Sequence, residues 1–347
     1  MQSRAGSAAA AGATATMKQQ STLFALLSLS LLLVRLLLRL RLAAFRDATL
    51  TLHLLARLRI RPVNIRLPGP DATTLRVWCP VSPSSKPPLL LLHGFGGDAK
   101  WTWADNFAAL SRSFHLYVPD LVFFGSHSRS ASPLRSVAFQ ARSAADAMRL
   151  LGVDRYHVAG ISYGGYVAYR MAAVEARDSV DRLVVMTSGV AATAQEVAAL
   201  AAREEMAVED ALLPDTAEGL RRLVCRSMHR PPRLPDFVLH EFVQLMFVDQ
   251  RKERSELLRE LLKNGAGIDP LPVLTQKTLV LWGDKDQVFP VDLGYGLQRH
   301  LGEGCRLEII KDAGHALQLE GAGKVNSFIT SFLLDGPSGP ELSIARK

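Results

Sequence analysis

Cysteine is scarce in this chain of 347 residues. It contains Cys79, Cys225 and Cys305 alone, with no CxxC pair and no even set of cysteines. A disulfide framework is therefore excluded, and reduced thiols in a cytosol-facing domain are expected. Cys79 and Cys305 lie in or beside apparent strands, where a free cysteine usually behaves as a small buried hydrophobic residue.

Acidic residues are missing from the beginning of the chain. None precedes Asp47, whereas six basic residues do, namely Arg4, Lys18, Arg35, Arg39, Arg41 and Arg46. The formal net charge of +8 is thus concentrated there, and the remainder is close to neutral. This distribution argues against a nucleic-acid partner, which needs basic charge across the folded surface, and favours a basic N-terminal segment that meets a membrane or a targeting receptor.

No uninterrupted apolar run is long enough for a comfortable membrane-spanning helix. Leu23–Val34 is apolar apart from two serines, but arginines then interrupt the leucine-rich continuation, and a crossing needs ~20 residues. We expect residues 1–45 to be a disordered start followed by a membrane-associated helix from Leu23 to about Phe45, with the rest of the chain on the cytosolic side. A signal anchor, an interfacial helix, a cleaved secretory signal and an organelle transit peptide all stay open.

Nucleotide and metal motifs are also absent. The chain has neither GxGxxG nor GxxxxGK[ST], and its histidines show no HxxxH-type pairing. We therefore expect neither a metal nor an organic cofactor.

From about Pro62, β-like runs alternate with helical stretches, which predicts a mostly parallel sheet with helices on both faces. The two runs Leu89–Leu92 and Leu183–Met186 are apolar throughout, as expected for strands covered on both sides. The eight predicted strands are Val63–Leu67, Thr74–Cys79, Pro88–His93, Phe114–Pro119, Tyr156–Gly160, Arg182–Thr187, Thr278–Trp282 and Arg306–Ile310.

The alternation stops between about Val190 and Pro272, where helical periods dominate. We interpret residues 190–272 as a helical cap inserted into the sheet domain, broken into pieces by Pro231, Pro232 and Pro235. The predicted organisation is thus a core of residues 46–189 and 273–336, the cap between them, and a tail of residues 337–347.

The sharpest local motif is Gly160-Ile161-Ser162-Tyr163-Gly164, between a predicted strand and a predicted helix. A serine on such a tight turn adopts a strained conformation, and the positions two before and two after must be small because side chains there would collide. The turn presents the serine hydroxyl at the carboxyl edge of the sheet, so Ser162 is the candidate nucleophile.

A serine hydroxyl needs a histidine base and a carboxylate that orients it. His315 lies in a loop after the last predicted strand, and two carboxylates, Asp284 and Asp286, follow the strand before it. This gives the chain order serine, acid, histidine. We choose Asp286 as the acid over Asp284, because the earlier position more naturally caps the turn.

The loop His93-Gly94-Phe95-Gly96-Gly97 follows the third predicted strand. Its glycines permit a close approach to Ser162, so the backbone N–H groups of Phe95 and Tyr163 are the candidate oxyanion donors. His93 is expected to be a structural hydrogen-bonding residue beneath this loop.

These residues resemble the α/β-hydrolase superfamily over roughly Val63 to Leu334. The landmarks that match in order are His93–Gly96, Val118–Asp120 with Gly125-Ser126, Gly160–Gly165, Gly283–Pro290 and Gly314-His315. Within the superfamily, the chain looks like monoacylglycerol-lipase-like and meta-cleavage-product-hydrolase-like members, which carry a helical cap in the same place. Epoxide hydrolases and haloalkane dehalogenases use an aspartate nucleophile, so serine at position 162 excludes them. Glu320 gives His315–Glu320 a likeness to the HxxxxD pattern of related acyltransferases, although a glutamate there could equally begin a helix.

The resemblance implies an α/β-hydrolase fold and a serine esterase or lipase that acts through an acyl-enzyme on a small hydrophobic ester. The apolar cap and the leucine-rich N-terminus favour a lipid-like substrate such as a monoacylglycerol. Three alternatives stay open: a carbon–carbon bond hydrolase of the meta-cleavage type, a receptor for small ligands built on the hydrolase fold, and a catalytically idle scaffold.

Overall fold

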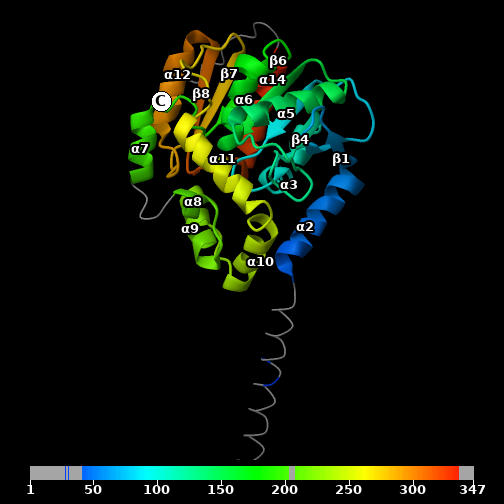
Figure 1. Cartoon of the computed structure of the whole chain (residues 1–347), viewed down its shortest axis with the longest axis vertical. Helices are drawn as coiled ribbons and strands as arrows, with labels where there is room; N and C mark the ends of the chain where they lie inside the picture. The colour runs from blue at the N-terminus through cyan, green and yellow to red at the C-terminus, as the bar shows by residue number, and fades with distance from the viewer. Residues whose placement is uncertain (1–27, 29, 31–40, 203–207, 336–347) are drawn as a thin grey trace, which may run out of the picture.

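The computed structural model describes residues 41–202 and 208–335, together with Ser28 and Ser30. Its centre is one sheet of eight strands in the order β1-β2-β4-β3-β5-β6-β7-β8 (Figure 1). The strands are β1 (Ile60–Arg66), β2 (Thr74–Pro80), β3 (Pro88–Leu92), β4 (His115–Pro119), β5 (Tyr156–Ile161), β6 (Val180–Met186), β7 (Lys277–Gly283) and β8 (Cys305–Ile310). The prediction of eight strands in one mostly parallel sheet is confirmed.

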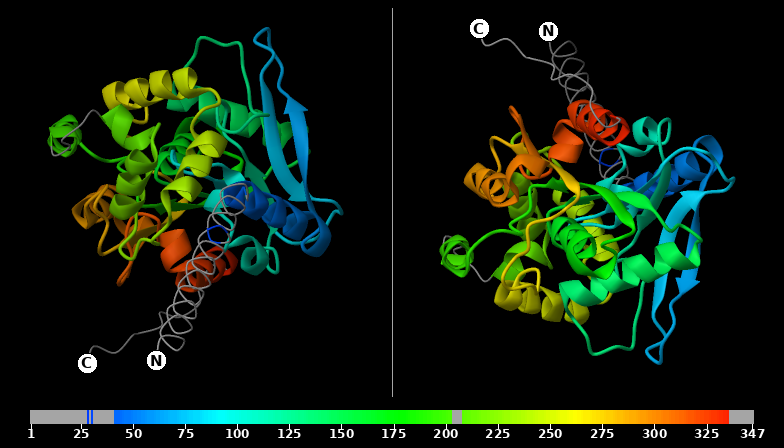
Figure 2. Two further views of the ribbon diagram at one scale, coloured as in Figure 1. Left: turned by 90° about the horizontal axis from the view of Figure 1, so that it is seen from below. Right: turned by 90° about the horizontal axis from the view of Figure 1, so that it is seen from above.

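The sheet is parallel from β4 to β8, and β2 is antiparallel to both of its neighbours. The hairpin of β1 and β2 forms one edge of the molecule (Figure 2). β1 begins at Ile60, three residues earlier than predicted, and runs through Pro62. An edge strand tolerates proline because one row of its backbone groups faces away from the sheet.

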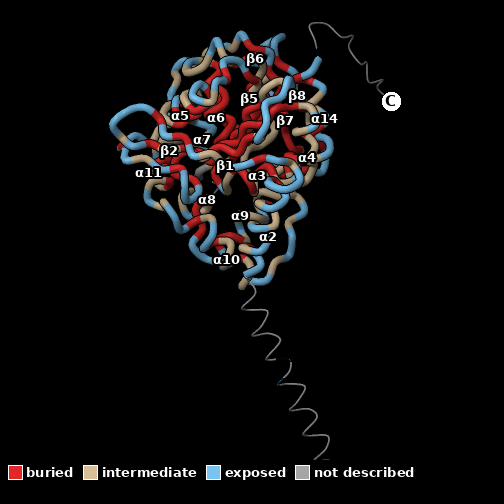
Figure 3. The backbone as a smooth tube through the Cα atoms, turned by 90° about the vertical axis from the view of Figure 1, so that its right-hand side faces the viewer, coloured by how far each residue is buried: buried red, intermediate tan, exposed pale blue. Residues whose placement is uncertain are grey.

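Helices cover both faces of the sheet. Consecutive leucines of β3 point to opposite sides, since Leu90 and Leu92 pack into one core cluster and Leu89 and Leu91 into the other. Figure 3 shows buried residues concentrated along the central strands. Side chains of α5 (Val137–Leu150), α6 (Tyr163–Arg170) with η2 (Met171–Glu175), and α12 (Val291–Leu301) belong to the first cluster, and those of η1 (His53–Arg57), α3 (Ala99–Thr102), α4 (Phe107–Leu110), α13 (Leu317–Glu320) and α14 (Ala322–Leu334) to the second. The short η3 (Gly302–Gly304) follows α12 and has no buried residue.

Residues 190–272 are called the helical segment below. Its described residues form five helices and contain no strand. The α9 helix is capped by Thr216, whose hydroxyl accepts a hydrogen bond from the Gly219 N–H, and the three prolines lie between α9 and α10. Figure 1 shows α8, α9 and α10 at the lower end of the described molecule, with α11 between them and the sheet domain. The five helices are α7 (Ala194–Ala202), α8 (Val208–Leu212), α9 (Ala217–Ser227), α10 (Asp236–Met246) and α11 (Arg251–Asn264).

The first described helix, α2 (Leu42–Leu52), lies beside α10 and α3 (Figure 1). Asp47 pairs with the buried ammonium of Lys100 at 2.7 Å and accepts the indole N–H of Trp101 at 2.8 Å. The Ala43 N–H donates to the Glu241 carboxylate of α10 at 2.9 Å. These bonds attach α2 both to the sheet domain and to the helical segment.

Most of the predicted membrane segment and the tail of residues 337–347 lie outside the described residues. Of residues 23–45, those from Leu42 onward belong to α2, which runs across the proposed boundary after Phe45. No helix in the described ranges has the length and apolar character needed to cross a membrane.

The three cysteines are free. Cys79 and Cys305 are buried, as predicted, and burial raises the pKa of both thiols, that of Cys305 to about 11. Both therefore stay protonated near neutral pH and act as core residues rather than nucleophiles.

Candidate active site

Ser162 occupies the turn between β5 and α6 in the strained conformation that the motif predicts. Its φ is 53° and its ψ is −119°. A Cβ on Gly160 would lie 2.1 Å from the Gly164 carbonyl oxygen, and a Cβ on Gly164 would lie 2.4 Å from that of Leu92. Only glycine fits at both positions, because such contacts are far inside van der Waals distance.

Asp286 and His315 come together at the ends of β7 and β8. The Asp286 Oδ2 accepts a hydrogen bond from His315 Nδ1 at 2.9 Å, and the Asp286 side chain is completely buried. Its other oxygen accepts the backbone N–H groups of Val288 and Phe289 at 2.8 and 2.9 Å. Three bonds thus fix the carboxylate, and Nε2 of the neutral imidazole is left with a lone pair.

Asp284 has other partners. Its Oδ1 accepts the Asp312 backbone N–H at 2.7 Å, and its Oδ2 pairs with the Lys285 ammonium at 3.2 Å. The bonds to Lys285 and Asp312 outweigh the cost of burial and lower its pKa. This carboxylate holds a turn together and does not bond to His315, which supports the choice between the two acids.

The glycine loop after β3 lies against Ser162, since a Cβ on Gly94 would sit 3.3 Å from the Ser162 Cβ. His93 beneath it is fully buried. Its Nε2 accepts the Leu121 N–H at 2.9 Å, so Nδ1 carries the proton and donates to the Gly94 carbonyl at 2.7 Å. Burial lowers the pKa of His93 to about 4, so the ring is neutral and has the structural role predicted for it.

The two residues predicted to supply the oxyanion donors both line the cavity that Ser162 faces. Phe95 is in the glycine loop, and Tyr163 is the first residue of α6, so its N–H has no partner within the helix. Their rings meet edge to face with centroids 5.6 Å apart. Gly94, Phe95, Ser162 and Tyr163 all line one cavity.

This cavity has a volume of about 270 Å³ and is mainly apolar. Ser162 and His315 both face it, although no hydrogen bond joins them within the described residues. Such catalytic hydrogen bonds are often long until substrate binds. The helical segment supplies six aliphatic side chains to its wall: Leu212, Leu220, Leu223, Val224, Leu258 and Leu261.

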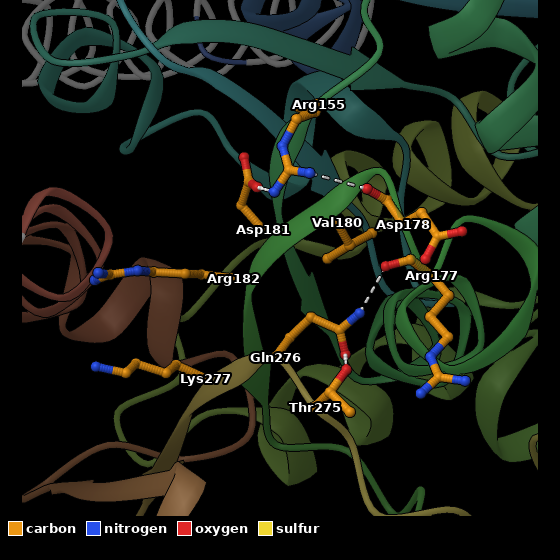
Figure 4. Close-up of a pocket in the computed structure, with 9 residues that line it drawn as sticks. All are labelled: Arg155, Arg177, Asp178, Val180, Asp181, Arg182, Thr275, Gln276 and Lys277. Atoms are coloured by element: carbon orange, nitrogen blue, oxygen red, sulfur yellow. Dashed lines mark hydrogen bonds and ion pairs between the residues drawn. The ribbon is translucent and has the colours of Figure 1, made fainter. Parts of the chain in front are cut away.

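A second hollow of about 460 Å³ lies at the opposite edge of the sheet, where β6 and β7 begin (Figure 4). Its charged lining residues are Arg155, Arg177, Asp178, Asp181, Arg182 and Lys277. Arg155 is paired with Asp181, and Arg182 donates to backbone carbonyls of Phe332 and Asp335. No serine, cysteine or histidine is among its described lining residues.

The sequence did not reveal a buried acidic pair behind the glycine loop. Burial raises the pKa of Asp98 to about 6, and burial together with the nearby Asp98 raises the pKa of Asp120. Asp98 accepts the Trp101 N–H and Asp120 the Ala99 N–H, so both hold α3 in place. No motif marks Asp98, although Asp120 lies within a landmark of the resemblance.

No group of three or more His, Cys, Asp or Glu residues that could hold a metal ion occurs in the described parts of the chain. The cavity brings together a serine hydroxyl, an aspartate-bound imidazole and backbone N–H groups.

The order of the strands in the sheet, the strained backbone of Ser162 and the hydrogen-bonded pair of Asp286 and His315 are together typical of an α/β hydrolase. The chain belongs to the alpha/beta hydrolase fold family, whose pattern matches residues 87–322.

Curated relatives cover about two thirds of the chain or more. Lipase 1 of Psychrobacter immobilis is 27% identical over 239 residues, which are 67% of this chain and 72% of the lipase. A 2-hydroxy-6-oxononadienedioate/2-hydroxy-6-oxononatrienedioate hydrolase of a Pseudomonas species is 26% identical over 71% of this chain and 87% of that hydrolase. A monoacylglycerol lipase of Xenopus laevis is 26% identical over 72% of this chain and 76% of that lipase. At a coarse level, the lipase relatives support an ester hydrolase.

Among solved structures, a bacterial membrane phospholipase A superimposes with a TM-score of 0.69 at 21% identity, covering 91% of this chain and 97% of that one. This likeness concerns the fold.

Proposed function

We propose that the protein is a serine hydrolase that cleaves a carboxylic ester of a hydrophobic or lipid-like substrate through an acyl-enzyme. The observation that carries the proposal is the Asp286–His315 hydrogen bond of 2.9 Å beside Ser162 in an apolar cavity. Lipase relatives support the same class of reaction.

In the proposed mechanism, Ser162 Oγ attacks the ester carbonyl while His315 Nε2 takes its proton. The N–H groups of Phe95 and Tyr163 stabilise the oxyanion, aided by the N-terminus of α6. His315 then returns the proton to the leaving alcohol, and water repeats the cycle on the acyl-enzyme. Asp286 keeps the imidazole oriented and stabilises its protonated form.

We further propose that the helical segment acts as a cap that selects the substrate. Its leucines form much of the cavity wall, and the volume of about 270 Å³ lies near the lower end of ligand sites. A flexible acyl chain suits this space better than a charged or bulky group, because the wall offers few polar partners.

Carbon–carbon bond hydrolysis is the second candidate function, and the meta-cleavage type of relative favours it. The lining of the cavity argues for the ester, since none of the described residues that line it is an arginine or lysine that could bind the carboxylate of a dienoate substrate.

For location, we propose membrane association with the catalytic domain facing the cytosol. The arginines that follow the apolar run support that orientation. Targeting to an organelle is the alternative.

The test is a substrate panel: p-nitrophenyl esters of increasing acyl length, monoacylglycerols, and a 2-hydroxy-6-oxo-dienoate. We expect turnover of the esters, rising from acetate to medium chains, and little turnover of the dienoate. Leu223→Trp should lower kcat/KM for medium chains by about tenfold or more and spare acetate, because it fills the cavity. Leu262→Trp, on the same segment but outside the lining, is the matched control. Preference for the dienoate would favour the second candidate.

A further inference from the structure

One carboxylate joins the loop that carries His315 to the helical segment. Glu320 lies at the end of α13, five residues after His315. Its Oε2 accepts the Gly314 backbone N–H at 2.7 Å and the His229 backbone N–H at 3.0 Å. Its Oε1 accepts the Arg230 backbone N–H at 2.7 Å. Glu320 therefore holds the residue before His315 and two residues just beyond α9.

The same two stretches of chain also touch directly. The Ala316 N–H donates to the Ser227 carbonyl at 2.8 Å. A Cβ on Gly314 would lie 2.8 Å from the Ser227 carbonyl oxygen and 2.9 Å from the His229 nitrogen. Residues 227–230, called the strap below, thus pack against the His315 loop with no room for a side chain between them.

Both stretches form part of the cavity wall. Ser227 and Met228 line the cavity from the strap, and His315 and Ala316 line it from the loop. Glu320 is not among the lining residues, which sets it apart from a group that touches substrate. A shift of the strap would therefore change the cavity and strain the loop that carries the imidazole.

The other side of the loop is bound to the sheet domain. The Lys285 N–H donates to the Ala313 carbonyl at 3.0 Å, and the Thr187 hydroxyl donates to the His315 carbonyl at 3.1 Å. These bonds fix the loop to the strand ends but leave the Gly314 N–H to Glu320. The Glu320 carboxylate is consequently the side chain that makes loop and strap one unit.

We propose that Glu320 is a positioning residue that aligns His315 and couples this alignment to the seating of the helical segment over the cavity. The inference rests on the proposed function, because it assumes that His315 is the base. It assigns Glu320 to neither of the two roles considered from sequence: the side chain ends a helix and binds backbone amides on both sides.

Three N–H donors converge on this side chain, so two acceptor oxygens are required. Glutamine has nearly the same shape but offers one oxygen, and its NH₂ group must face at least one of the N–H groups. Glu320→Gln therefore breaks at least one of the three hydrogen bonds that join the loop to the strap, without creating a cavity. Glu303→Gln, at an exposed position before β8, is the matched control.

The experiment uses the full chain and measures kcat and KM for p-nitrophenyl esters, with active sites titrated to completion by a fluorophosphonate. Because kcat is calculated per titrated active site, a loss of folded protein does not lower it. For Glu320→Gln we expect kcat per titrated site to fall at least tenfold for acetate and medium-chain esters alike, with KM for acetate changed less than threefold. Glu303→Gln should match the wild type.

Hydrogen exchange supplies a readout that does not depend on activity. In Glu320→Gln, peptides covering residues 227–233 and 311–317 should both exchange faster, whereas peptides from β5 and α6 should not change. If Glu320→Gln fails to fold, Glu320→Asp serves instead, since its shorter side chain cannot reach loop and strap together. The same pair of peptides and the same loss in kcat are then expected.

Unchanged kcat per site, or faster exchange in one peptide without the other, would overturn the inference. So would a rise in KM for medium chains with kcat preserved, because that pattern means a cavity wall without coupling to His315. Wild-type protein that neither labels nor hydrolyses esters would instead refute the proposed function. The exchange measurement would still test whether Glu320 joins the loop to the strap.

Discussion

Two carboxylates stand two residues apart after β7, and their partners separate their roles. Asp286 is buried and bonded to His315, whereas Asp284 holds the Asp312 N–H and pairs with Lys285. Chain order predicts an acid in this turn and position within the turn favours Asp286, whose side chain turns inward in the fold. A sequence cannot separate them by type, because both are aspartates on one loop.

Asp286→Asn should lower kcat by about 10⁴, because the amide oxygen stays with the Val288 and Phe289 N–H groups and the NH₂ group then faces Nδ1, which favours the wrong imidazole tautomer. Asp284→Asn should cost less than about tenfold, since its carbonyl oxygen still accepts the Asp312 N–H. Steady-state kinetics on one ester compare the two variants. Equal losses, or a larger loss at Asp284, would mean that the acid is assigned wrongly.

The contact between α6 and β3 depends on a missing side chain. A Cβ at Gly164 would collide with the Leu92 and His93 carbonyls at 2.4 and 2.6 Å. The helix can therefore start directly behind Ser162 and direct its N-terminus at the cavity. The GxSxG spacing predicts this packing, so the contact is among the most predictable of the fold.

Gly164→Ala should reduce the free energy of unfolding by at least about 3 kcal/mol, because the backbone of β3 cannot yield to the new methyl group. Gly323→Ala is the matched change in α14, where the Cβ meets nothing within 4 Å, and should stabilise by up to about 1 kcal/mol. Chemical denaturation measures both. A Gly164→Ala protein as stable as the wild type would contradict the packing described here.

Contacts between distant elements were beyond sequence reasoning. The eight strands could be predicted because apolar runs such as Leu89–Leu92 are buried on both faces. The Asp47–Lys100 pair, and the bonds from Glu320 to His229 and Arg230, join residues far apart in the chain. No local spacing encodes them, because they form only when α2 and the helical segment dock on the sheet domain.

The whole molecule combines a sheet domain, a helical segment over its cavity, and a basic N-terminal region that precedes α2. Since α2 docks on α3 and α10, a truncation that preserves the fold should start at Arg41 rather than at Asp47. The leucine-rich part is then removed while the Asp47–Lys100 pair stays intact.

We expect the full chain to be recovered with membranes after cell fractionation and the chain from Arg41 to be soluble with its esterase activity retained. The physical reason is that the apolar run and its arginines are lost together. Full-length protein in the soluble fraction, or protein processed near residue 45 inside an organelle, would refute the membrane proposal.

Labelling with a fluorophosphonate, which reacts with an activated serine, tests the central claim most directly. Wild-type protein should carry one label, mapped to Ser162 by mass spectrometry, and label should be blocked by a medium-chain ester. Ser162→Ala should fold with the same thermal midpoint, carry no label, and lose ester turnover by a factor on the order of 10⁶. Folded wild-type protein without label, or a Ser162→Ala variant that still labels and turns over, would contradict the account.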